Sequence, residues 1–163
     1  MKSLQTLDAL HILIYPEIFK STLNGVLDYN LAKEKGVMKA DLVDGKFTKN
    51  QMLTLIKQYA HVDLYKERFK GSVKADINKE NIVASLDLKS NKSSIKTKNT
   101  KLNSKTKKIN SKIDINANGN PIVITLTGNA ASPKVQIDAE KLIKKEAEKA
   151  ITKELNNFFK KLF

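Results

Sequence analysis

Side chains suited to acid–base or metal chemistry are few in this chain of 163 residues. The two histidines are His11 and His61, and the absence of cysteine excludes thiol nucleophiles and cysteine-ligated metals. Asp63 lies near His61, but no third partner for a triad and no nucleophile motif accompany them. Asp114 and Asp138 fall at a polar strand position and a helix start, which are structural roles. We therefore expect no enzymatic activity, no cofactor and no metal site.

A second chemistry, the binding of apolar ligands, is suggested by apolar side chains that alternate with polar ones. In residues 23–31 the odd positions are apolar apart from Gly25. Similar alternation recurs in residues 73–77, 82–88, 113–117 and 122–126. Since alternate strand residues share one face of a sheet, these side chains would form an apolar face. The candidate contacts for acyl chains on this face are Leu27, Tyr29, Leu31, Val73, Ile77, Leu86, Leu88, Ile113, Ile115, Ile124 and Leu126.

The same apolar side chains have a structural interpretation. An apolar sheet face must be covered by helices, by a second sheet or by an apolar ligand. The candidate residues could therefore form an ordinary core beneath the helices, and the sequence leaves both interpretations open.

Lysine dominates the charge balance. The chain has 30 basic and 17 acidic residues, for a net charge of +13, and Arg68 is its one arginine. Between Asp87 and Asp114 there is no acidic residue, and the lysines there indicate solvated strand faces, contact with anionic lipid headgroups, or nucleic-acid binding. The candidate headgroup-facing residues are Lys96, Lys98, Lys105, Lys107 and Lys108.

The nucleic-acid interpretation has little chemical support. Base-edge recognition favours the arginine fork, and single-strand binding uses aromatic platforms, yet residues 70–157 contain no arginine and no aromatic residue. Lysine alone supports only salt-sensitive phosphate contact, so we expect no specific nucleic-acid partner.

The elements that would position these residues follow from periodicity and turn signals. Residues 3–14 have helical spacing, and Thr48 with Gln51 resembles a capping box that starts a helix over about 48–61. The predicted fold class is α+β, mainly β. It comprises a curved antiparallel meander of about eight or nine strands with one apolar face, a short helix after the first hairpin, and a long C-terminal amphipathic helix. One module would span residues 1–163, divided into a helical segment at 1–22, a β-rich sheet at 23–137 and the amphipathic helix at 138–163.

The predicted C-terminal helix ends in a cluster of large apolar side chains. Phe158, Phe159, Leu162 and Phe163 are the candidate contacts for a membrane or a partner protein. Alternatively, the helix closes the core of the sheet itself.

The compartment is left open by the residues alone. No apolar run reaches about 18 residues, so we expect no membrane-spanning helix. Asp8 and His11 interrupt the apolar N-terminal stretch, and no small-x-small cleavage site follows. The chain is then either cytoplasmic or a fragment whose export signal lies upstream.

Three short motifs, in order, resemble the C-terminal region of AsmA-like proteins, the family that includes TamB-type envelope proteins. They are residues 23–31 (LNGVLDYNL), residues 44–47 (DGKF) before a helix, and residues 128–138 (GNAASPKVQID) before a basic helix. The resemblance covers about residues 23–163. It implies a periplasmic module, anchored in the inner membrane through an upstream segment, that acts in lipid transport or outer-membrane assembly and contacts phospholipid or an envelope protein.

The alternatives are a structural or protein-interaction module that uses the C-terminal helix, and a lysine-rich nucleic-acid-binding protein. Because the chain is short compared with long lipid-transporting bridges, it would supply only a segment of an apolar groove.

Overall fold

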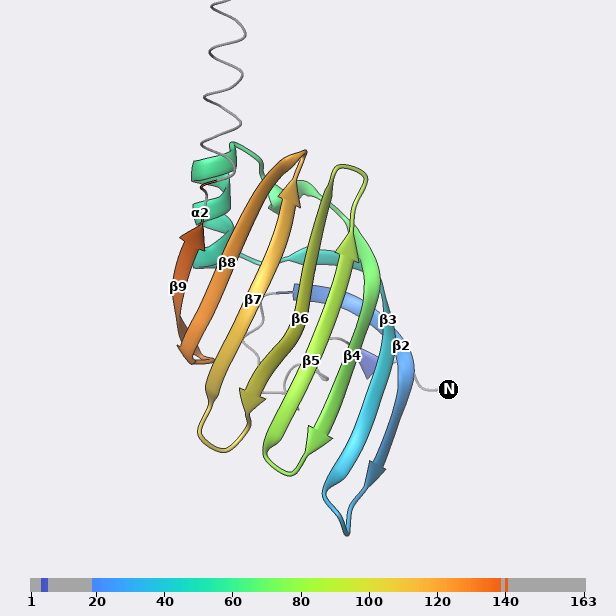
Figure 1. The fold of residues 1–163 in the computed structure, drawn as a ribbon. Coiled ribbons are helices and arrows are strands. Elements are labelled where there is room, and N and C mark those ends of the chain that lie inside the picture. The colour runs from blue at the N-terminus through green and yellow to red at the C-terminus, as the bar shows by residue number, and fades with distance from the viewer. Residues whose placement is uncertain (1–3, 6–18, 139, 141–163) are drawn as a thin grey trace, which may run out of the picture.

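The computed structural model describes residues 4–5, 19–138 and 140, most of which belong to one antiparallel sheet (Figure 1). Its strands are β1 (Leu4–Gln5), β2 (Phe19–Asn30), β3 (Lys35–Phe47), β4 (Phe69–Asn78), β5 (Asn81–Lys89), β6 (Ser93–Asn103), β7 (Lys108–Ala117), β8 (Asn120–Asn129) and β9 (Ser132–Asp138). The helix α2 (Gln51–Ala60) and the 3-10 turn η1 (Leu64–Lys66) connect β3 to β4.

The strands pair in sequence order, so the sheet is a meander from β1 to β9. Most connections are tight turns, as between β7 and β8, where Asn118 and Gly119 both have positive φ angles of 51° and 82°. This is the conformation of a type I′ turn, whose twist matches that of the flanking strands. The Asn116 side chain accepts a hydrogen bond from the backbone N–H of Gly119 at 2.7 Å.

One face of the sheet is apolar, because buried and exposed residues alternate along the strands. In β7 the alternation is complete from Lys108 to Ala117. The cross-strand register places Ile115 opposite Ile95 on one side and Ile122 on the other, which aligns apolar side chains across three strands.

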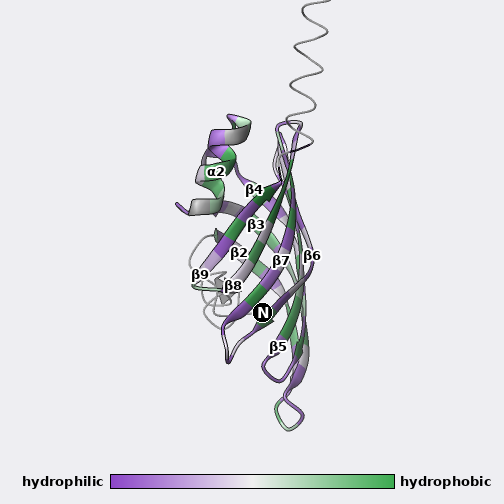
Figure 2. Ribbon diagram, turned by 60° about the vertical axis from the view of Figure 1, so that its left-hand side comes forward, coloured by the Kyte–Doolittle hydropathy of each residue, from purple (hydrophilic) through white to green (hydrophobic). Residues whose placement is uncertain are grey.

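The helix α2 lies against this apolar face near one end of the sheet (Figure 2). Its Leu53 and Ile56 are 1% and 0% exposed and pack in the main core cluster with Leu64 of η1. The Asn50 side chain caps the helix by accepting a hydrogen bond from the N–H of Leu53 at 2.9 Å. At the other end, His61 adopts the left-handed conformation that often terminates helices.

The predicted fold class is wrong in its helical part. Nearly all described residues with regular structure lie in β-strands, and α2 is the one α-helix whose bounds the structure describes. The predicted α+β fold with a long C-terminal helix is therefore not the fold of the described residues. Asp138 ends β9, and the remainder of the predicted helix at 138–163, apart from Glu140, lies outside the described residues. The N-cap of α2 is Asn50, one residue before Gln51, rather than the predicted Thr48.

The predicted N-terminal helical segment is wrong wherever the structure describes it. Leu4–Gln5 is strand β1, paired with Thr22 and Leu23, and residues 19–22 already belong to β2. Residues 6–18 lie outside the described residues.

Candidate functional site

Ten of the eleven predicted acyl-chain contacts lie on the apolar face of the sheet. The register aligns Val73 with Leu86, and it aligns Ile113 with Ile124. Leu27 and Tyr29 occupy the β2 end of the same face, and Leu31 lies in the turn that follows β2.

Burial divides these candidates into two groups. Five are packed in the core cluster that includes α2 and are at most 6% exposed, namely Leu88, Ile113, Ile115, Ile124 and Leu126. In the structure these five side chains are core residues surrounded by neighbouring side chains, and their contact with an acyl chain stays a prediction. Val73, Ile77 and Leu86 are half-buried, whereas Leu27, Tyr29 and Leu31 are 54%, 38% and 83% exposed. The available apolar surface therefore lies away from α2.

A hollow of about 690 Å³ lies near the end of the sheet opposite α2. Most of its lining side chains belong to the polar face, because Val83 lies opposite Lys101 and Lys101 lies opposite Asn110. Ile82, Leu102 and Ile109 alternate with these residues, are 4–6% exposed and belong to a second, smaller core cluster on the other face. The size of the hollow is within the range of small-molecule sites, but its lysine, asparagine and threonine side chains do not suit an acyl chain.

Four turns lie side by side at this end, because alternate turns of a meander fall at the same end of the sheet. Backbone hydrogen bonds link them: Lys79 N–H donates to the Glu34 carbonyl, Ser104 N–H to Glu80, and Ala130 N–H to Lys107. Their lysines form a surface that we call the basic rim, made of Lys33, Lys35, Lys79, Lys105, Lys107 and Lys108.

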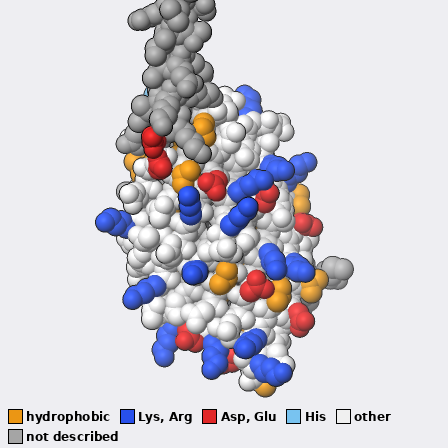
Figure 3. Space-filling view, viewed as in Figure 1, with side chains coloured by type: hydrophobic (Ala, Val, Ile, Leu, Met, Phe, Trp, Pro, Cys, Tyr) orange, Lys and Arg blue, Asp and Glu red, His pale blue; other side chains and the backbone are white. Residues whose placement is uncertain are grey.

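The predicted headgroup lysines are split between two surfaces. Lys105, Lys107 and Lys108 belong to the basic rim, whereas Lys96 and Lys98 lie on strand β6. Lys96 is on the polar face and forms an ion pair with Asp87 at 3.2 Å. Figure 3 shows lysines interspersed with acidic side chains on the sheet face turned to the viewer in Figure 1. That face is a solvated mixture of charges, so its lysines are less available to an anionic ligand.

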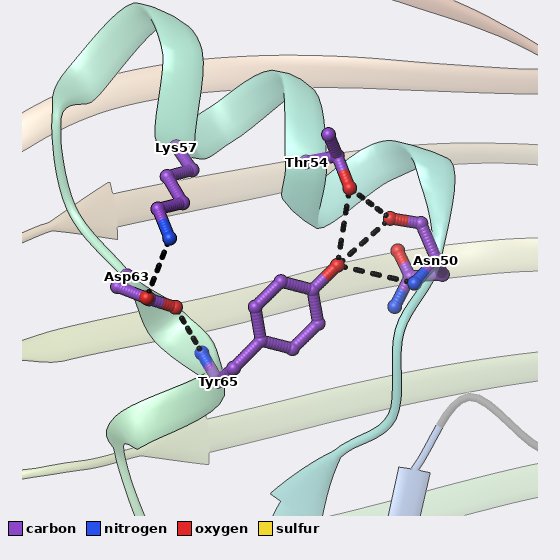
Figure 4. A network of polar contacts seen from close by, with 5 residues as sticks. All are labelled: Asn50, Thr54, Lys57, Asp63 and Tyr65. Carbon is purple, nitrogen blue, oxygen red and sulfur yellow. Dashed lines mark hydrogen bonds and ion pairs between the residues drawn. The ribbon is translucent and has the colours of Figure 1, made fainter.

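A polar network fixes the connection that carries α2 (Figure 4). The Tyr65 hydroxyl donates to the Asn50 carbonyl at 2.9 Å and accepts from the Asn50 backbone N–H at 3.1 Å. Lys57 donates to Asp63 at 2.8 Å, and this hydrogen bond lowers the pKa of Asp63 below its usual value of 3.8. The network therefore joins α2 to η1 and holds the helix over the apolar face.

The acid–base candidates are separated or engaged in structural contacts. Asp63 is bonded to Lys57 and to the N–H of Tyr65, while His61 is the exposed C-cap of α2. Asp114 is on a polar strand position, and Asp138 accepts from the N–H of Glu140 at 3.1 Å. His11 lies outside the described residues. In the described part of the chain, no group of three or more acidic, histidine or cysteine side chains is placed to hold a metal ion.

The membrane or partner contacts predicted at Phe158, Phe159, Leu162 and Phe163 also lie outside the described residues. Among the helices that the structure describes, none has both the length and the apolar character needed to cross a membrane. No family model, curated protein or solved structure matches the chain.

Sequence reasoning missed the hollow and half of the basic rim. Lys33, Lys35 and Lys79 are distant in sequence from the other rim lysines, and only the even spacing of turns in a meander indicates that they meet.

Proposed function

We propose that the chain is a non-enzymatic, lipid-handling module that binds the acyl part of a phospholipid at the uncovered part of its apolar face. The single observation that carries the proposal is the exposed apolar surface at the β2 end of this face, where Leu27 and Tyr29 are 54% and 38% exposed and Leu31, in the following turn, is 83% exposed. Each methylene group that leaves water contributes about 0.8 kcal/mol, so even part of an acyl chain gives useful affinity.

The basic rim gives this module its orientation on a membrane. Six lysines crowd one end of the sheet, accompanied in the linked turns by two acidic residues, Glu34 and Glu80. Leu31, 83% exposed, projects from the turn at this end. A cationic rim with an exposed apolar side chain favours contact with anionic headgroups, which would bring Leu27 and Tyr29 next to the lipid.

The proposal includes a cellular setting that rests on the motif resemblance to AsmA-like proteins. In that setting the module acts in the cell envelope, on the periplasmic side, in lipid transport or outer-membrane assembly. An upstream segment anchors it, and its partner is phospholipid, a membrane surface or another envelope protein.

Flotation of the full chain with vesicles tests the membrane part of the proposal. The variant Lys105→Gln/Lys107→Gln/Lys108→Gln removes half of the basic rim. Its matched control, Lys70→Gln/Lys112→Gln/Lys134→Gln, removes the same charge from strand positions of the polar face, all of them exposed.

Each lysine near an anionic surface contributes about 1 kcal/mol, so the rim variant should bind anionic vesicles at least about tenfold more weakly. The control should keep most of the wild-type affinity, and vesicles of neutral lipid should bind neither protein well. Equal losses in the two triple variants would show that total charge matters and that the rim has no special role.

A further inference from the structure

In the part of the chain that the structure describes, the sheet edge at Asn24–Asn30 of β2 is unpaired and carries exposed apolar side chains. β1 pairs only with Thr22 and Leu23, so the described backbone partner of Asn24–Asn30 is β3 alone. Along this stretch Val26 and Leu27 are 66% and 54% exposed. A seven-residue strand edge with exposed apolar side chains is a template for pairing with another strand.

The opposite edge of the sheet, at β9, has different chemistry. Pro133 lacks a backbone donor, Lys134 adds a charge, and no large apolar side chain of β9 is strongly exposed. A proline and a lysine on an edge strand both protect natural sheets from unwanted pairing. The contrast makes β2 the edge at which pairing is favoured.

We propose that β2 pairs antiparallel with β2 of a second copy of this chain, about a two-fold axis that passes through Leu27. This register places Leu27 opposite itself and places Tyr29 opposite Gly25 of the second copy. Gly25, Leu27 and Tyr29 share the apolar face, so an aromatic ring would lie beside a glycine and cover it, an arrangement that stabilises edge glycines. The stretch Asn24–Asn30 is centred on Leu27, so all seven residues pair.

The charges on the polar face agree with this register. Val26 lies opposite Lys39, and Lys39 lies opposite Lys74, which is an unfavourable pair of like charges. In the proposed dimer Asp28 of the second copy lies opposite Val26 and joins the same cross-strand row. Its carboxylate lies nearest to Lys39, while Lys74 already forms an ion pair with Asp76 at 3.8 Å.

The interface is short, so the association is expected to be weak and dependent on protein concentration. Seven paired residues fall below the area of a standard stable interface. Two apolar faces joined at β2 would nevertheless form one continuous face twice as wide. The pairing is independent of lipid, so its failure leaves the proposed function untouched.

Disulfide cross-linking tests the register, because the chain contains no cysteine. Residues directly opposite in an antiparallel pair have Cα atoms about 4.5–5.5 Å apart, which a disulfide spans. Leu27→Cys should therefore give a cross-linked dimer under mild oxidation. The matched control is Leu31→Cys, which is more exposed but would lie about 26 Å from its counterpart along the strand.

If Leu31→Cys cross-links as fast as Leu27→Cys, or faster, the disulfides form by random collision and the proposed register is overturned. Sedimentation of the cysteine-free chain provides the second measurement. The wild type should shift toward dimer as protein concentration rises, and Val26→Lys should abolish this shift. Val43→Lys alters a 47% exposed residue of the interior strand β3 and should keep the shift. A wild type that remains monomeric at every concentration would overturn the proposal.

Discussion

At the residue scale, the ion pair between Lys57 and Asp63 links folding to pH. Lys57 stabilises the charged form of Asp63, so the pKa of this carboxyl is lower in the folded chain than in the unfolded one. The unfolded state then binds more protons at low pH. The pair's contribution is complete above the usual value of 3.8 and is lost as pH falls through the lower, folded-state pKa.

We therefore expect Asp63→Asn to be less stable than wild type at neutral pH, with the difference shrinking on acidification below about pH 4. Urea midpoints measured at several pH values check this. An unchanged difference between the two proteins down to pH 2 would contradict the assigned role of the pair.

Tyr65 supplies a second residue-scale prediction. Its hydroxyl exchanges two hydrogen bonds with the backbone of Asn50 and lies 3.3 Å from the Thr54 hydroxyl. Tyr65→Phe removes these contacts but keeps the ring, so the free energy of unfolding should fall by about 1–2 kcal/mol. Chemical denaturation measures the loss, and wild-type stability in the variant would show that water replaces the hydroxyl without cost.

At the element scale, α2 is held by packing more than by its own helical propensity. Ile56 is fully buried against the sheet, and Ile56→Ala should lower the free energy of unfolding by about 2–5 kcal/mol. Leu31→Ala, at an 83% exposed position, is the control and should change it by less than about 0.5 kcal/mol. Similar effects of the two substitutions would mean that α2 does not cover a real core.

The central strands approach each other closely at Gly71. A Cβ atom there would lie 1.8 Å from the carbonyl oxygen of Asp87, which belongs to the backbone of β5. Gly71→Ala must therefore displace a strand and should destabilise the chain by more than about 1 kcal/mol, as thermal or urea unfolding would detect. The neighbouring Ser72→Ala, on the exposed face, should be nearly neutral, and a neutral Gly71→Ala would contradict the close approach.

The sequence predicts strands better than it predicts helices in this chain. Alternation together with the turn residues Asn118 and Gly119 locates β7 and β8, because side-chain period and turn conformation are local properties. The stretch at Leu4–Gln5 has helical spacing, yet it is a strand in the structure. Short apolar runs fit both periods, and pairing with β2 decides between them.

The candidate site is predictable only in part, for a related reason. Alternation assigns Leu27 and Ile124 to the same face, but it cannot tell that one is 54% exposed and the other fully buried. Burial depends on which half of the face α2 covers, and this is a tertiary property. The basic rim likewise requires the order of the strands, which brings distant turns to one end.

At the scale of the whole molecule, the two faces of the sheet differ in polarity, and so do its two ends. One face is apolar and the other is charged, and α2 covers the apolar face near the end opposite the basic rim. This arrangement leaves Leu27, Tyr29 and Leu31 as exposed apolar side chains away from α2. The central claim is that this uncovered part of the apolar face accepts the acyl part of a phospholipid.

Native mass spectrometry of the full chain purified from cells tests that claim most directly. Leu27→Asp/Leu31→Asp places charges on the exposed apolar side chains, whereas Val43→Asp alters a 47% exposed valine on the polar face. We predict bound phospholipid in the wild type and in Val43→Asp, and its loss in Leu27→Asp/Leu31→Asp. Wild-type protein free of phospholipid, both as purified and after incubation with phospholipid vesicles, would contradict the account.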